Sequence, residues 1–188
     1  ERIGMGPEKK SRVISKEERN LTAYHESGHA ILSLFIPKAN PLHKVSILPR
    51  GVAGGYTLMP ATEDRHIHTK TELMASITVA LGGRASEEII FNEVSTGAMS
   101  DIKGATDIAR TMVTRYGMSD RLGHLTFGKP YEEVFLGRDI AEERNYSEET
   151  AHAIDEEVKK LVDECYAAAK KTLLEHKEDL GLLATALL

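Results

Sequence analysis

The 188-residue sequence predicts a mainly α-helical domain that carries one small β-hairpin. Apolar residues recur at helical spacing over four long stretches, whereas only the segment between residues 44 and 59 shows a convincing strand pattern. Hydrophobic residues make up 41% of the chain and charged residues 28%, which is typical of a soluble globular protein. We therefore expect a packed helical core with a hairpin at one edge.

The first helix is expected to follow a short tether. Residues 1–14 are charged, contain glycine and proline and show no sustained period, so they are expected to lie outside the domain, which would span residues 15–188. Ser15 as the N-cap and Glu18 three residues later fit a capping box. The helix that they begin should end before Pro37.

A hairpin and a second helix are expected next. Lys44 to Met59 should form two short strands, because their apolar residues are interrupted by Pro49-Arg50-Gly51 and Gly54-Gly55. The second helix should run from about Thr71 to Phe91. Inside it, Gly82-Gly83 predicts a kink or a close contact between helices.

The C-terminal half is predicted to be helical on both sides of an irregular region. A third helix should span Asp101 to Tyr116, with Gly117 as its C-cap, and residues 117–146 should be irregular. A long helix is expected from about Ser147 to His176, followed by a short terminal helix from Asp179. The single cysteine, Cys165, lies on the apolar face of the long helix and is expected to be a buried core residue.

Composition excludes several classes of protein. The net charge of −5, with acids and bases interspersed, argues against a nucleic-acid partner, and the absence of Trp argues against a base-stacking platform. No apolar run approaches the roughly 20 residues that span a bilayer, and the N-terminal residues do not resemble a signal peptide. The chain as given is therefore expected to be soluble.

One pentapeptide, His25-Glu26-Ser27-Gly28-His29, carries the chemistry. His25 and His29 would lie on one face of the first helix and could share a metal ion. Glu26 lies about 100° around that helix and could reach a zinc-bound water, whose pKa falls to about 7, and then pass the proton to the leaving amine. Apolar neighbours predict that the motif is buried, which disfavours two exposed histidines flanking a solvated glutamate.

A catalytic zinc site needs a third protein ligand. The metzincin pattern fails, because Leu32 and Phe35 stand where that class has Gly and His. A downstream helix could supply a carboxylate as in gluzincins, and a helix start after a Gly-containing loop could supply another; the candidates are Glu87, Glu88 and Asp101. Spacing alone leaves the choice open between Glu87 and Asp101. Three more histidines, expected to be solvent-exposed, are His43, His66 and His68.

Several blocks occur in order along nearly the whole chain. They are Tyr24-His25-Glu26-Ser27-Gly28-His29-Ala30, Val45–Gly51, Gly82-Gly83-Arg84 with Glu87-Glu88-Ile89-Ile90, Ser95-Thr96-Gly97-Ala98 with Asp101-Ile102, Phe135-Leu136-Gly137-Arg138, and Tyr146-Ser147-Glu148. Together they resemble the peptidase domain of FtsH-type AAA proteases. The resemblance implies a helical zinc metallopeptidase domain with one Zn²⁺ per chain, held by His25, His29 and Asp101, and with Glu26 as the general base.

The resemblance also implies roles around this centre. Glu87 matches a carboxylate near the family's site and would orient a ligand histidine; the alternative is an exposed glutamate paired with Arg84 or Lys103. The strand pair between Val45 and Met59 would be the edge on which an unfolded polypeptide substrate adds as an extended strand. The alternative for this hairpin is a structural cover.

In full, the resemblance implies an ATP-dependent, membrane-anchored endopeptidase that degrades unfolded or membrane proteins as a homo-hexamer. Its ATPase and transmembrane parts would precede this chain. The chain has no Gly-x-x-x-x-Gly-Lys-[Ser/Thr] loop, so ATP would bind only in the ATPase. The peptidase would lie on the cytoplasmic side of the inner membrane. Two alternatives stay open: a non-catalytic, ring-forming scaffold with a structural metal, and a stand-alone gluzincin-type peptidase that uses Glu87.

Overall fold

The structure is a computed structural model that describes residues 15–48, 54–60, 67–128 and 145–188. Its elements, in order, are α2 (Lys16–Phe35), β1 (Lys44–Ser46), β2 (Tyr56–Leu58), α3 (Lys70–Ala80), α4 (Gly82–Phe91), the 3₁₀ turn η1 (Thr96–Ala98), α5 (Met99–Thr114), α6 (Glu148–Glu175) and α7 (Lys177–Leu187). The mainly α-helical fold with one small hairpin is confirmed. The predicted tether, the Pro49-Arg50-Gly51 turn and the Phe135–Arg138 block lie outside the described residues.

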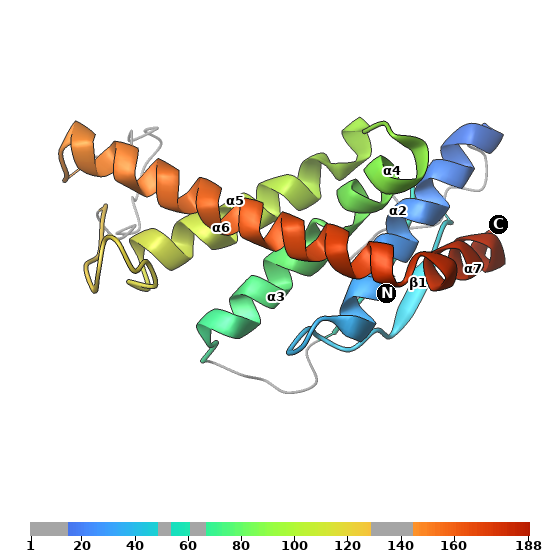
Figure 1. The fold of residues 1–188 in the computed structure, drawn as a ribbon, viewed down its shortest axis with the longest axis horizontal. Coiled ribbons are helices and arrows are strands. Elements are labelled where there is room, and N and C mark those ends of the chain that lie inside the picture. Colours follow the sequence, from blue (N-terminus) through green and yellow to red (C-terminus); the bar gives the residue numbers. More distant parts are fainter. Residues whose placement is uncertain (1–14, 49–53, 61–66, 129–144) are drawn as a thin grey trace, which may run out of the picture.

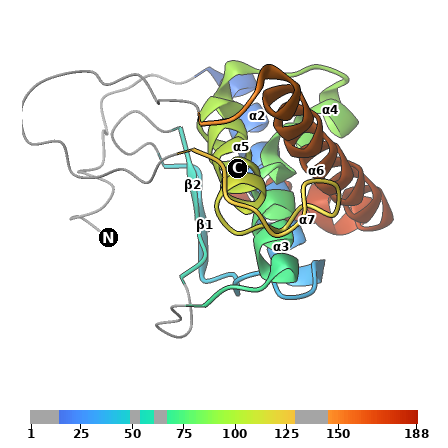
Figure 2. The same ribbon diagram turned by 90° about the vertical axis from the view of Figure 1, so that its left-hand side faces the viewer.

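The long helix α6 organises the molecule. It packs against α3, α4 and α5, and α7 continues from its end to lie beside α2 (Figure 1). The hairpin lies on the opposite side of the helices from α6 (Figure 2), and α2 contacts both of its strands. The strands pair antiparallel, with Val45 opposite Thr57. Helix α2 is therefore held between a helical layer and a short sheet. No helix within the described ranges has both the length and the apolar character that a membrane crossing requires.

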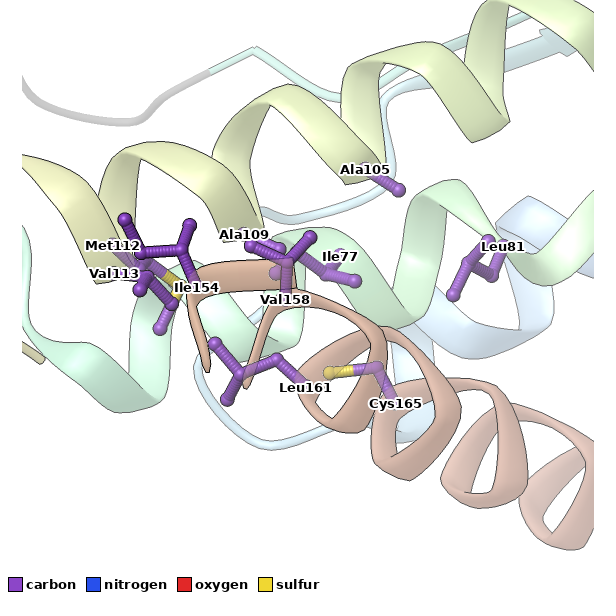
Figure 3. Close-up of a cluster of buried hydrophobic side chains, with 10 residues drawn as sticks. All are labelled: Ile77, Leu81, Ala105, Ala109, Met112, Val113, Ile154, Val158, Leu161 and Cys165. Atoms are coloured by element: carbon purple, nitrogen blue, oxygen red, sulfur yellow. The ribbon is translucent and has the colours of Figure 1, made fainter. Parts of the chain in front are cut away.

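The largest apolar cluster joins α3, α5 and α6 (Figure 3). Side chains from one face of each helix interdigitate there, as the helical periodicity predicted. Cys165 belongs to this cluster and is 2% exposed, which confirms it as a core residue. The buried members are Ile77, Leu81, Ala105, Ala109, Met112, Val113, Ile154, Val158, Leu161 and Cys165.

Capping side chains fix where two helices begin. The Oγ of Ser15 accepts a hydrogen bond of 3.0 Å from the backbone N–H of Glu18, so α2 begins where the sequence predicted. Helix α3 begins slightly earlier than expected. The reason is a full capping box, in which Thr69 caps the N–H of Glu72 and the Glu72 carboxylate accepts from the N–H of Thr69.

Both ends of α5 differ from the prediction. Helix α5 begins at Met99 instead of Asp101, because η1 leads directly into it. Its C-cap is Arg115, so the prediction of Gly117 as the C-cap is wrong by two residues. Gly117 nevertheless adopts φ +59°, the left-handed conformation that favours glycine, in the turn that follows the helix. Within residues 117–128 the chain forms no helix, as predicted.

The expected helix over residues 71–91 is two helices, α3 and α4, that meet at Leu81. The close contact predicted at Gly82 is confirmed, and its partner is Gly28 of α2. A Cβ atom on Gly28 would lie 2.4 Å from the carbonyl oxygen of Gly82, and one on Gly82 would lie 2.9 Å from the backbone of Gly28. The two backbones touch, and this contact brings the histidine face of α2 against α4.

Replacing Gly28 with Ala is expected to destabilise the fold by about 1–3 kcal/mol, because the new methyl group must push two backbones apart. This loss should exceed the gain of up to about 1 kcal/mol that Ala brings to a helix interior. Gly104, in the middle of α5, has nothing within 4 Å of its Cβ position and is the matched control. Urea titrations measure the free energy of unfolding of both variants, and Gly104→Ala should be more stable than the wild type. A Gly28→Ala protein as stable as the wild type would contradict the contact.

Candidate metal centre

Two helices bring three possible ligands together. His25 and His29, on adjacent turns of α2, are 8% and 6% exposed, and their Nε2 atoms lie 3.1 Å apart. Asp101 lies in the first turn of α5. Its Oδ2 atom is 3.2 Å from Nε2 of His25 and 3.6 Å from Nε2 of His29. These residues form the one group in the described chain with metal-ligand geometry.

Each histidine is oriented by a hydrogen bond at Nδ1, the ring nitrogen that points away from the centre. Nδ1 of His25 lies 2.7 Å from Oε1 of Glu87, and Nδ1 of His29 lies 2.8 Å from the carbonyl oxygen of Val79. A carbonyl can only accept. Glu87 is held ionised as well: burial raises its pKa, but hydrogen bonds from His25 and Ser95 outweigh that effect and lower it. Both Nδ1 atoms therefore donate, and each ring, once it is neutral as metal binding requires, presents an Nε2 lone pair to the centre.

The converging atoms fit a zinc ion. Two imidazole lone pairs and one carboxylate oxygen are all acceptors, so a cation is the group that satisfies them together. Ligands bonded at 2.0–2.1 Å in a tetrahedral zinc site lie about 3.3 Å from one another. The three separations here are 3.1, 3.2 and 3.6 Å. Three protein ligands of this kind are also the number in catalytic zinc sites, which keep one position for water or substrate.

Glu87 supports the centre from behind His25. It is 0% exposed, so the alternative of an exposed glutamate paired with Arg84 or Lys103 is wrong. Its carboxylate also accepts from the backbone N–H and the hydroxyl of Ser95, at 2.7 and 3.0 Å. The carboxylate meets the ring edge opposite the converging atoms, and this geometry favours Asp101 over Glu87 as the third ligand.

The His25 ring also packs directly against the backbone of α4 at Gly83. A Cβ atom on Gly83 would lie 2.3 Å from Cε1 of His25. Any side chain there would push the ring out of place, so the residue must be glycine. The Gly82-Gly83 pair therefore serves two contacts, one with the α2 backbone and one with the imidazole.

Glu26 is set apart from the three candidate ligands and faces the hairpin. It is 7% exposed, and its Oε2 atom accepts a hydrogen bond of 2.7 Å from the Thr57 hydroxyl. Burial raises the pKa of Glu26, against the lowering effects of His29, the Thr57 hydroxyl and His25. A carboxylate with a raised pKa beside the centre is suited to take up and release a proton.

The other candidates lie elsewhere. Glu88 points away from the centre to α6, where it pairs with Lys170 at 2.8 Å and accepts from the hydroxyl of Tyr166. His43 and His68 are exposed, as expected, and His66 lies outside the described residues. Glu88, His43 and His68 are not members of the group formed by His25, His29 and Asp101.

Three contributors to the site were not predicted: the Val79 carbonyl, Ser95 and Thr57. A backbone carbonyl leaves no signal in the sequence. Ser95 stands in a block that the sequence singled out, although its bond to Glu87 depends on tertiary structure. Thr57 follows Gly54-Gly55 in a predicted strand, and alternation along that strand would have placed it on the same face as Gly55.

The centre opens into a cleft of about 1080 Å³ between α2, the hairpin, α3 and the loop before α5. Apolar residues line it beside the polar groups, among them Leu21, Tyr56, Met59, Val79 and Met99. Within the described ranges, β2 pairs only with β1, so β2 is an edge strand of this two-stranded sheet and lines the cleft.

Known proteins are similar to this chain along its whole length. Residues 12–188 match the sequence model described as peptidase family M41. Proteins named ATP-dependent zinc metalloprotease FtsH are 54% identical over 187 residues in Caldicellulosiruptor bescii, 53% over 189 in Bacillus subtilis and 51% over 188 in Veillonella parvula. Each alignment covers 100% of this chain but only 29–30% of the relative, so the chain spans about three-tenths of their length. By the extent of these matches, the chain belongs to peptidase family M41.

Proposed function

We propose that the chain is a zinc-dependent endopeptidase in which His25, His29 and Asp101 hold one Zn²⁺. The observation that carries the proposal is the convergence of three acceptor atoms, 3.1 to 3.6 Å apart. The printed names of the relatives, zinc metalloproteases, support both the metal and the reaction. Zn²⁺ bound there would supply a water with a pKa near 7 and polarise a peptide carbonyl.

The chain's own residues would move the proton and hold the substrate. Glu26 takes a proton at its carboxylate and delivers it to the nitrogen of the leaving amine. Glu87 keeps the His25 ring in one tautomer and one orientation. As an edge strand, β2 could add an extended peptide through backbone hydrogen bonds, which carry little side-chain selectivity. Unfolded polypeptides meet that requirement, and folded proteins do not.

The parent protein would be larger than this chain. Because the chain spans about 30% of relatives named ATP-dependent proteases, we extend the proposal to an ATPase part that delivers unfolded or membrane proteins to the peptidase. ATP would bind in that part alone. A homo-hexamer anchored in the inner membrane, with its peptidase domains on the cytoplasmic side, completes the proposal.

The two alternatives lack support in the geometry. A structural zinc needs a fourth protein ligand, whereas the metal group in the described residues has three members. A gluzincin-type site needs Glu87 on the metal, whereas Glu87 binds Nδ1 of His25.

The test is cleavage of an unfolded, casein-like substrate with and without a metal chelator. We expect chelation to abolish cleavage and one equivalent of Zn²⁺ to restore it, while Mg²⁺, which prefers oxygen ligands, should not. Cleavage that persists in chelator would contradict a metal mechanism.

Stability without zinc should depend on pH through His25. Burial lowers the pKa of His25, but hydrogen bonds to Asp101 and Glu87 and the charge of Glu26 outweigh it and raise the pKa from 6.5 to about 9. A folded pKa above the unfolded value stabilises the fold fully below pH 6.5, and this stabilisation is lost as the pH rises through 9. The zinc-stripped protein should therefore lose up to about 3 kcal/mol over that window in urea titrations. His25→Gln should show a flatter profile, and a wild-type profile that rises with pH would contradict the assignment.

A further inference from the structure

We propose that Thr57 is a positioning residue for Glu26: its hydroxyl fixes one carboxylate oxygen so that the other faces the cleft. The inference rests on the proposed function, because it assigns Glu26 the proton transfer. It concerns a residue on the hairpin, far in sequence from the helix that carries the metal motif.

The hydrogen bond is short and well placed. Oγ1 of Thr57 lies 2.7 Å from Oε2 of Glu26 and 3.2 Å from the Glu26 carbonyl oxygen. A hydroxyl has one proton, and the shorter contact has the length of a charge-assisted bond to a carboxylate. The proton therefore goes mainly to the side chain, and the more distant carbonyl oxygen is at most a weaker second acceptor of the same proton.

The second oxygen of Glu26 is left available. Within the described residues, Oε1 makes no hydrogen bond, while Oε2 is engaged by Thr57. Glu26 also lines the cleft, together with Thr57 and the three metal candidates. One anchored oxygen and one open oxygen are what a base needs if it is to meet a substrate in a single orientation.

Strand β2 is shaped for this contact. Residues 55 and 57 lie on the same face of an extended segment, and that face meets α2. At Gly55 a Cβ atom would lie 2.9 Å from Cγ of Glu26, so the missing side chain makes room for the glutamate. At Thr57 the side chain binds it. The pairing of Thr57 with Val45 in the hairpin fixes the position of Thr57 along the strand, opposite Glu26.

The test compares three variants of the full zinc-loaded chain on a fluorogenic peptide. Thr57→Val keeps the shape and removes the hydroxyl, and Thr57→Ser keeps the hydroxyl. Thr111→Val is the matched control, because its hydroxyl donates only to the carbonyl of Asp107 within α5. We expect Thr57→Val to lower kcat by roughly 10- to 100-fold, with KM and zinc affinity within about twofold of wild type. Thr57→Ser should recover most of kcat, and Thr111→Val should match the wild type.

A second readout keeps the inference separate from the proposed function. In crystals of zinc-loaded Thr57→Val, the Glu26 carboxylate should leave its position or occupy several rotamers. If the Glu26 carboxylate keeps one undisplaced position in Thr57→Val, the positioning role of Thr57 is wrong, whether or not the wild type is active. An inactive wild type would instead refute only the peptidase proposal. An unchanged kcat in Thr57→Val, or an equal loss in Thr57→Val and Thr57→Ser, would also overturn it.

Discussion

Glu26→Gln is expected to lower kcat by roughly 10²- to 10⁴-fold, the range that a general acid–base contributes. Glutamine has nearly the same shape, and its amide oxygen can still accept the Thr57 hydroxyl, but it cannot take up a proton. The change leaves the three metal candidates untouched. Steady-state kinetics on an unfolded substrate, with zinc content measured in the same samples, checks the expectation.

Zinc affinity distinguishes the loss of a general base from damage to the metal site. It should stay within about twofold of wild type in Glu26→Gln, because Glu26 lies outside the group of His25, His29 and Asp101. Thermal unfolding should also be close to that of the wild type or slightly raised, since a buried carboxylate with an elevated pKa is replaced by a neutral amide. Full activity of a parent protease that carries Glu26→Gln would favour the non-catalytic scaffold with a structural metal.

Asp101→Ala is expected to weaken zinc binding by more than about 100-fold, and Glu87→Gln by about 10- to 100-fold. Asp101 presents its oxygen to both Nε2 atoms, whereas Glu87 acts through the Nδ1–H of His25. Residues that orient a ligand typically contribute 10- to 100-fold to metal affinity, and loss of a ligand costs more. Competition with a chromogenic chelator measures both variants on one scale.

The order of the two effects matters more than their size. Glu88→Gln is the matched control, because Glu88 neighbours Glu87 on α4 but pairs with Lys170. It should bind zinc like the wild type. A larger loss in Glu87→Gln than in Asp101→Ala would contradict the assignment and favour a gluzincin-type site.

Local patterns predicted much of this fold. The Ser15 cap, the spacing of His25 and His29, and the long helix to Glu175 depend on residues within one or two turns of each other, so a single sequence shows them. The burial of the motif also followed from its apolar neighbours. The kink or close contact expected at Gly82-Gly83 was visible too, whereas its partner, Gly28 of α2, depends on tertiary packing and was not.

The identity of the third ligand could not be predicted from local sequence patterns. Both Glu87 and Asp101 come within reach of His25, from different helices and on opposite sides of its ring. Only the packing of α4 and α5 around α2 decides which side each carboxylate occupies, and no spacing in the chain encodes it. The resemblance to FtsH-type proteases implied Asp101 before the geometry favoured it. Thr57 was missed for the same reason, since its partner Glu26 lies 31 residues away in the chain.

A crystal structure of the zinc-loaded protein, with anomalous data collected at the zinc edge, tests most directly whether His25, His29 and Asp101 hold a catalytic zinc. We predict one zinc peak bound by Nε2 of His25, Nε2 of His29 and an oxygen of Asp101 at about 2.0–2.2 Å, with a fourth position taken by water. Glu87 on the metal, or a fourth protein ligand in place of that water, would contradict the account.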